Sequence, residues 1–192
     1  EARVAGVERA QPEPEPAVPY WPALRQSARR VGRQWLSGGV ALTGASSVTF
    51  VPQDSTREHA VVSTPAAFSR EDGPVAYFEA TVVAAGKRFV GIGVVPSTYP
   101  RHRQPGWEEG SWGLHSDDGK LYEQQPAEDK AKQTGEKFGQ GDVVGCGCIF
   151  GSGMTRLFWT KNGKLLKIRV ELRGKERVLR PAVGLGAEAE VA

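Results

Sequence analysis

Residues that could carry chemistry occur in this chain, but their spacing does not assemble a catalytic site. Three glycine pairs could approach a phosphate, yet none is followed by a third glycine and a helix, or by Gly-Lys-Ser/Thr. These pairs are Gly91-Ile92-Gly93, Gly151-Ser152-Gly153 and Gly184-Leu185-Gly186. No serine lies in a Gly-x-Ser-x-Gly elbow, and no His and Asp follow in the order of a nucleophile triad. We therefore predict a protein that is not an enzyme, with no catalytic residues, no cofactor and no small-molecule substrate.

The candidate metal ligands are equally scattered. Cys146 and Cys148 lie two apart on an expected strand, where they share one face and are poorly placed for a disulfide. The three histidines pair with nothing at zinc-ligand spacing. Asp117-Asp118-Gly119 lacks the alternating ligands and distal Glu of a calcium loop, so a turn whose carboxylates accept backbone N–H groups is favoured over a cation site. We expect no metal, and two reduced core cysteines that indicate the cytoplasm or nucleus, with an organelle as the alternative.

Composition favours short strands joined by turns. The 192 residues include 24 Gly and 13 Pro but one Met and two Cys, which suits one all-β domain with an appendage. The net charge of +3 is too mild to argue for a nucleic-acid partner. No apolar run approaches the length of about 18 residues that a membrane span needs.

The N-terminal segment differs from the remainder. Residues 1–20 are rich in Pro and Glu, which predicts an extended tether. Over residues 21–36, apolar side chains recur at helical spacing opposite a basic face, which predicts a short amphipathic helix. The apolar positions are Leu24, Ala28, Val31 and Trp35, and the basic ones are Arg25, Arg29, Arg30 and Arg33. This helix either binds an acidic partner, a membrane surface or a nucleic acid, or serves as a targeting segment, or packs on the following domain; packing is favoured.

From residue 37 onward the periodicity is that of strands. We expect strands over residues 40–42, 47–51, 59–63, 77–82, 89–95, 144–150 and 181–185, the last being the final one. Asn162-Gly163 predicts a tight hairpin, because both residues tolerate the positive φ of a type I′ turn. The charged segment 126–140 is expected to be an exposed loop.

Seven segments, in this order, resemble the SPRY domain family. They are Tyr77-Phe78-Glu79-Ala80-Thr81, Val90-Gly91-Ile92-Gly93-Val94, Pro105-Gly106-Trp107, Ser111-Trp112-Gly113-Leu114-His115-Ser116-Asp117-Asp118-Gly119, Gly141-Asp142-Val143-Val144-Gly145-Cys146, Phe158-Trp159-Thr160-Lys161-Asn162-Gly163 and Pro181-Ala182-Val183-Gly184-Leu185. The Pro-Gly-Trp and His-x-Asp-Asp-Gly elements look most like the Ran-binding-protein branch, whose members are ubiquitin-ligase scaffolds. The self-association and helical motifs of those scaffolds are absent here, so the resemblance does not extend to ligase membership.

The resemblance implies a fold and a mode of action. The fold would be an antiparallel β-sandwich of the concanavalin-like jelly-roll type over residues 37–192. The family recognises a short segment of a partner protein through loops at one edge of the sandwich. Here that implies the loop at 97–104, flanked by the stretch at 70–72 and the turn at 186–188. The family usually continues into a closing strand where residues 187–192 stand, so that strand is either lost or divergent.

The resemblance also implies roles for individual residues. Tyr99 would supply apolar area and a hydroxyl, Arg101 or Arg103 would contact a carboxylate, and Gln104 would hydrogen-bond a peptide backbone. Arg70 would flank these residues. Trp107 is left open between the site and the framework, whereas Trp112 is expected in the core.

Three functions follow from these observations. The first is a non-catalytic interaction module that binds a protein segment, as part of a multi-subunit assembly. The second is a purely structural subunit anchored by its tether and basic helix. The third, a carbohydrate-binding sandwich, is kept for the Trp and Asp content and is the least favoured.

Overall fold

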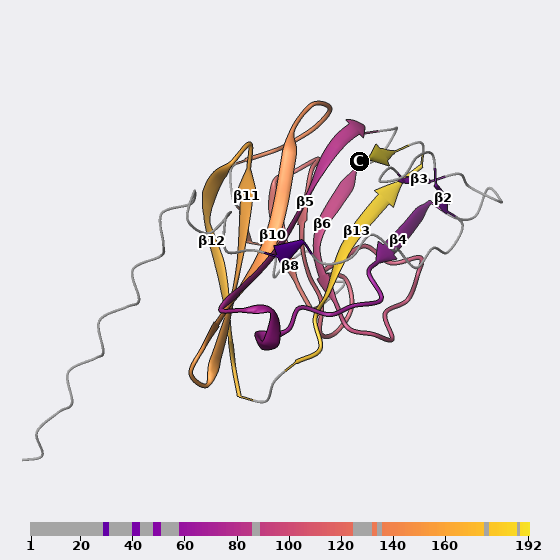
Figure 1. Cartoon of the computed structure of the whole chain (residues 1–192). Helices are drawn as coiled ribbons and strands as arrows, with labels where there is room; N and C mark the ends of the chain where they lie inside the picture. Colours follow the sequence, from indigo (N-terminus) through magenta and orange to yellow (C-terminus); the bar gives the residue numbers. More distant parts are fainter. Residues whose placement is uncertain are drawn as a thin grey trace, which may run out of the picture.

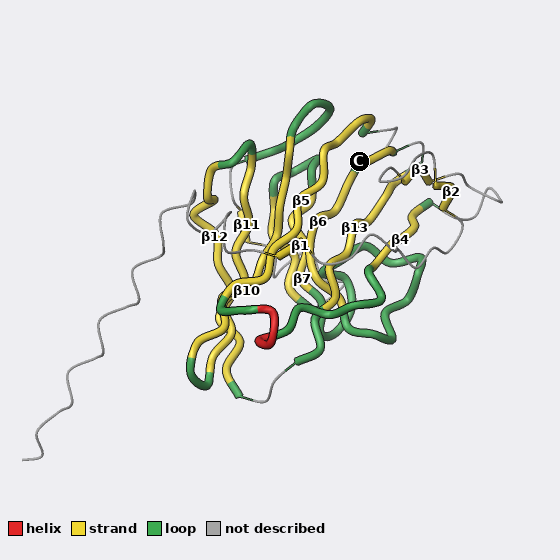
Figure 2. Tube along the Cα trace, viewed as in Figure 1, coloured by secondary structure: helices red, strands yellow, loops and turns green. Residues whose placement is uncertain are grey.

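Strand pairing arranges the chain in two sheets, which pack face to face (Figure 1). This computed structural model describes residues 29–30, 40–42, 48–50, 58–85, 89–124, 132–133, 136–174, 177–187 and 189–192. Among these residues the only helical element is η1 (Arg70–Asp72), one turn of 3-10 helix coloured red in Figure 2. No helix there has the length and hydropathy of a membrane span.

The first sheet, as far as the structure describes the chain, has eight strands. Their order is β12 (Lys164–Arg173), β11 (Met154–Lys161), β10 (Val143–Gly151), β5 (Val75–Ala84), β14 (Glu190–Val191), β3 (Val48–Phe50) and β2 (Val40–Leu42), with β1 (Arg29–Arg30) paired parallel to β5. The other pairings in this sheet are antiparallel.

The second sheet has six strands within the described residues, and all of its pairings are antiparallel. Their order is β4 (His59–Ser63), β13 (Arg180–Gly186), β6 (Val90–Val95), β7 (Trp112–His115), β8 (Lys120–Glu123) and β9 (Lys132–Gln133). The predicted antiparallel β-sandwich is confirmed.

The core lies between the two sheets and uses the period-two alternation of their strands. Val144, Cys146 and Cys148 of β10 are fully buried, as the alternation predicts. Burial raises the pKa of both thiols, so they stay protonated and pack as small apolar side chains. Trp159 of β11 joins the sheets, because its indole N–H donates a hydrogen bond to the Ile92 carbonyl at 2.8 Å.

The hairpin between β11 and β12 has the predicted turn. Asn162 and Gly163 adopt φ values of 49° and 75°, the left-handed conformation that a type I′ turn needs at both positions. The Asn162 side chain supports this turn, since its amide N–H donates to Asp142 Oδ1 at 2.7 Å. On β12, Leu166 and Val170 are buried while the charged residues between them face solvent.

The structure corrects three expectations. Within the predicted helix at 21–36, residues 29–30 form strand β1; the remainder of that helix and the tether at 1–20 lie outside the described residues. The strand at 181–185 is not the last, because β14 follows it and pairs with both β3 and β5. The segment 126–140 is not wholly a loop: residues 132–133 form β9, and Phe138 is buried.

Candidate functional site

The loop between β6 and β7, residues 96–111, covers part of the second sheet (Figure 2). Val61 and Ala182 alternate with the core residues Val62 and Val183, so they face away from the core. They are nevertheless buried, because Tyr99 of the loop packs against them and Val95. The Arg101 carbonyl also accepts a hydrogen bond from the Val61 N–H at 2.8 Å. The loop is thus attached to the sheet by both apolar and backbone contacts.

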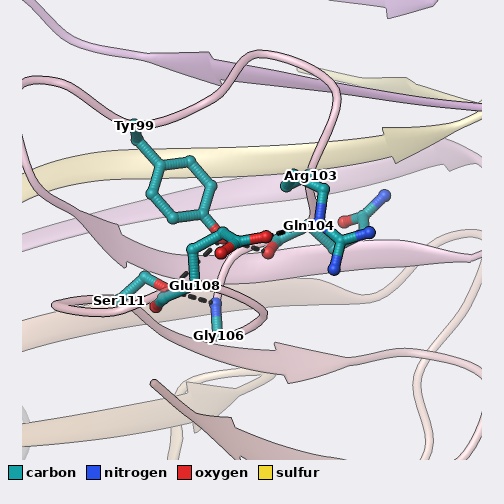
Figure 3. A network of polar contacts seen from close by, with 6 residues as sticks. All are labelled: Tyr99, Arg103, Gln104, Gly106, Glu108 and Ser111. Atoms are coloured by element: carbon teal, nitrogen blue, oxygen red, sulfur yellow. Dashed lines mark hydrogen bonds and ion pairs between the residues drawn. The ribbon is translucent and has the colours of Figure 1, made fainter. Parts of the chain in front are cut away.

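A polar network fixes the shape of the loop (Figure 3). The Tyr99 hydroxyl donates a hydrogen bond to the backbone carbonyl of Gln104 at 2.5 Å. Ser111 donates to the Glu108 carbonyl at 2.5 Å and accepts from the Gly106 N–H at 2.9 Å. Burial raises the pKa of Tyr99 to about 12, so its hydroxyl remains a donor at neutral pH.

Gln104 lies inside the protein. Its side chain is fully buried, with Nε2 3.3 Å from His59 Nδ1. Its Oε1 occupies the space above Gly91 and Gly184, which face each other across β6 and β13; a Cβ would come within 2.7 Å of Oε1 at Gly91 and 1.8 Å at Gly184. In this structure Gln104 anchors the loop to the sheet.

Arg103 and Trp107 pack together at the surface of the loop. The Arg103 guanidinium lies 5.0 Å from the centre of the Trp107 ring, and its Nε donates to Glu108 Oε1 at 2.7 Å. Both members of this ion pair are about one-third exposed, so the pair orders the loop more than it stabilises the fold.

Beneath Trp107 lies an aromatic cluster centred on His115. This imidazole stacks on Tyr122 and Phe89, with ring centres 4.1 Å and 4.8 Å away. The Trp107 ring lies edge-on to it, with ring centres 5.9 Å apart. Burial lowers the pKa of His115 to about 4, so the ring is neutral and its Nε2–H donates to the Pro105 carbonyl at 2.9 Å. Trp107 therefore serves partly as framework.

The Asp-Asp-Gly element is a turn, as predicted. Asp118 Oδ1 accepts from the Lys120 N–H at 2.9 Å, and Oδ2 accepts from the Tyr122 hydroxyl at 2.9 Å. Gly119 completes the turn with a φ of 69°. The part of the chain that the structure describes holds no cluster of three or more His, Cys, Asp or Glu side chains suited to a metal ion.

The comparison with known proteins decides the family. Residues 75–192, more than half of the chain, match the SPRY domain family. This chain belongs to the SPRY domain family. The SPRY family is one of protein-interaction modules, and the predicted resemblance is confirmed.

Relatives of this SPRY domain include Ran-binding proteins. The domain is 36% identical over 118 residues to human SPRY domain-containing protein 3, a match covering 59% of this chain and 26% of that protein. It is 39% identical over 116 residues to the Ran-binding protein M homolog of Arabidopsis thaliana, covering 59% and 23%. The chain thus spans about a quarter of the length of these relatives.

A solved structure has the same architecture. The crystal structure of a human SPRY domain matches this chain with a TM-score of 0.69 at 29% identity, covering 81% of this chain and 94% of that one.

The structure brings most of the predicted site residues of this SPRY domain together. The 96–111 loop carries Tyr99, Arg101, Arg103, Gln104 and Trp107. Of these, Arg101 is exposed, Gln104 is buried, and the other three are partly buried. Arg70 belongs to a different surface: its Nη2 donates to the Gly151 carbonyl at 2.8 Å, and its guanidinium lies 5.4 Å from the Phe150 ring centre.

Sequence reasoning missed the residues that shape the loop. From the sequence, Ser111 is assigned only to a family motif, and Glu108 is assigned no role. Their contacts with Gly106 and Arg103 arise from the turns of the loop, so spacing alone gives little signal. A cluster of Ser, Glu and Gly within a loop that also carries three prolines is the available sign.

Proposed function

We propose that this SPRY domain binds a short segment of a partner protein at the outer surface of the 96–111 loop. The observation that carries the proposal is the network of Tyr99, Gln104 and Ser111, which holds an exposed loop in one conformation. A loop that is already ordered loses less conformational entropy on binding, so more of its contact energy appears as affinity.

The exposed part of the loop has the composition of a recognition surface. Pro100, Arg101 and His102 are exposed, and the Arg103–Trp107 pair lies beside them. Arginine and aromatic side chains supply most of the binding energy in protein interfaces, because they combine apolar area with directed hydrogen bonds. Arg101 would contact a carboxylate or backbone carbonyls of the partner segment.

The buried residues would act indirectly. The Tyr99 hydroxyl and the Gln104 side chain already have contacts within the domain. We assign them to holding the loop in its binding conformation, while direct contacts come from Arg101, His102 and the outer faces of Arg103 and Trp107.

Peptide selection tests the proposal. Peptides would be selected from a random library on the intact chain, and their affinities measured for the wild type and Arg101→Ala. The substitution leaves unchanged the backbone carbonyl of Arg101, which attaches the loop to β4. We expect affinity to fall about tenfold. Arg169→Ala, which alters an exposed arginine on β12, is the matched control and should leave affinity unchanged.

The proposal includes a place within a multi-subunit assembly. A photo-cross-linking amino acid at the exposed position of His102 would join the loop to its neighbour in the native particle. Cross-links to one segment of one subunit are expected. Cross-links that are absent or spread over many proteins would contradict this part of the proposal.

A further inference from the structure

A pocket of about 160 Å³ lies at the edge of the sandwich, and none of its described lining residues belongs to the 96–111 loop. Its walls come from η1, from β11 and β12 of the first sheet, and from the stretch that leads into β13. The lining residues that matter here are Arg70, Met154, Leu172, Arg177 and Leu179. A cavity of about 150 Å³ holds a group the size of benzene, so this pocket suits one side chain of a partner.

The two arginines of the pocket are each held by another group. Arg70 donates from Nη2 to the Gly151 carbonyl and lies over the Phe150 ring. It begins η1, which is capped by Ser69 through a hydrogen bond from the Glu71 N–H at 3.1 Å. The Arg177 guanidinium lies 5.6 Å from the centre of the Trp112 ring. Both arginines are also exposed, so each has contacts within the domain and can be reached from solvent.

The other described residues of the pocket walls are apolar or uncharged. Leu172 is partly exposed and supplies apolar area, whereas Leu179 is buried and forms the apolar floor. Among the described residues that line the pocket there is no carboxylate. Glu171, the neighbour of Leu172 on β12, contacts Arg156 at 3.2 Å and Arg173 at 3.7 Å. Val178, next to the pocket, is 58% exposed, a large value for an aliphatic side chain.

We infer that this pocket is a second protein-binding site, which takes an acidic segment of a partner. A glutamate or aspartate side chain enters between Arg70 and Arg177, and a neighbouring apolar side chain lies on Leu172 and Val178. Arginine is suited to this task, because its planar guanidinium carries five N–H donors whose geometry matches a carboxylate. The described residues that form this site lie outside the 96–111 loop.

A pair of short probe peptides tests this site on the complete 192-residue chain. The first carries adjacent glutamates beside a leucine, and the second has glutamines in their place. We expect the glutamate peptide to bind with a Kd at or below about 1 mM, and more weakly as salt rises from roughly 0.05 to 0.5 M. The glutamine peptide should bind at least tenfold more weakly.

Single substitutions locate the binding. Arg70→Gln and Arg177→Gln should each weaken binding of the glutamate peptide about tenfold. Arg173→Gln, which changes a β12 side chain that is 82% exposed and does not line the pocket, should have little effect. Arg177→Gln leaves the Arg70–Gly151 contact intact, so it tests the site even if Arg70→Gln loosens η1.

The outcomes separate this inference from the function proposed for the loop. Loss of glutamate-peptide binding in Arg101→Ala, with Arg70→Gln and Arg177→Gln unaffected, would assign the probe to the loop and overturn the inference. Equal binding of the glutamine peptide, or no binding at millimolar concentration, would also overturn it. None of these results bears on peptides selected for the loop.

Discussion

Gln104 and Gly184 are so close that a Cβ on Gly184 would lie 1.8 Å from the Gln104 side-chain oxygen. The glutamine comes from the 96–111 loop and the glycine from β13, so this contact joins the candidate site to the sheet beneath it. The position requires glycine because of the close approach of its neighbours, which also include Pro105.

Gly184→Ala should therefore displace the loop as well as destabilise the fold. Overpacking a filled site costs about 2 kcal/mol, which would appear as a lower midpoint of urea unfolding at constant m-value. Gly139→Ala is the matched control, because a Cβ at Gly139 meets nothing within 4 Å and its effect should be small. Equal losses of stability in the two variants would show that Gln104 does not fill the space above Gly184.

A double-mutant cycle measures the contact itself. In a Gln104→Ala background the amide that collides with the new methyl group is gone, so Gly184→Ala should cost less than it does in the wild type. Additive free energies of unfolding would rule out direct coupling between the two positions.

Tyr99→Phe tests whether the phenol orders the loop. The substitution keeps the ring against Val61, Val95 and Ala182 but removes the donor to the Gln104 carbonyl. We expect a loss of about 1 kcal/mol in the free energy of unfolding. Hydrogen exchange at the Trp107 and Ser111 amides, which close turns of the loop, should become faster while β13 amides keep their relative protection. Unchanged hydrogen exchange in the loop would show that the Tyr99 hydroxyl does not stabilise the loop.

His115 should make stability depend on pH. Its pKa is about 4 in the folded protein against an ordinary 6.5, so the unfolded chain binds the extra proton between these values. Burial is the dominant cause; His59 also lowers the pKa, whereas the Pro105 carbonyl and Asp118 raise it. The free energy of unfolding is therefore highest above pH 6.5, where His115 is neutral in both the folded and the unfolded protein. It falls by about 3 kcal/mol as the pH drops to 4.

Unfolding free energies at several pH values between 4 and 7 would measure this dependence. In His115→Gln the side chain can still donate to Pro105 but does not titrate, so the slope over this range should become flatter than that of the wild type. Identical slopes in the two proteins would assign the acid sensitivity to carboxylates instead.

Trp159 should contribute to the association of the two sheets. Trp159→Phe removes the N–H that reaches the Ile92 carbonyl and leaves space in a fully buried position. We expect the free energy of unfolding to fall by about 2 kcal/mol, measured by urea denaturation. Surface substitutions usually change the free energy of unfolding by less than about 0.5 kcal/mol. A loss that small would show that neighbouring side chains fill the space left by the indole.

Local signals in the sequence were sufficient for much of the sandwich. The strand at 59–63, the core cysteines and the Asn162-Gly163 hairpin follow from period-two burial and turn chemistry, which act over a few residues. The strand β14 could not be predicted in this way, because it has only two residues, Glu190 and Val191, and follows a stretch of Ala and Glu with low strand propensity. Its pairing with β3 and β5 creates it.

The site was predictable as a loop but not as an arrangement. The motif order led to residues 97–104, yet the burial of Gln104 depends on two glycines from strands far apart in the chain. Arg70 was expected beside the loop, whereas the turn of η1 directs it to Phe150 and Gly151 of the first sheet. Such placements depend on tertiary packing, which residue spacing does not encode.

The most direct test of the central claim is to map where a bound segment lies. A peptide selected on the intact chain would be titrated into isotope-labelled protein, and the backbone amide shifts followed by NMR. We predict that the largest shifts fall at residues 97–103 and 107, with smaller ones in β4 beneath them. Shifts confined to the first sheet or to the Arg70 pocket, with the 96–111 loop unchanged, would contradict the claim.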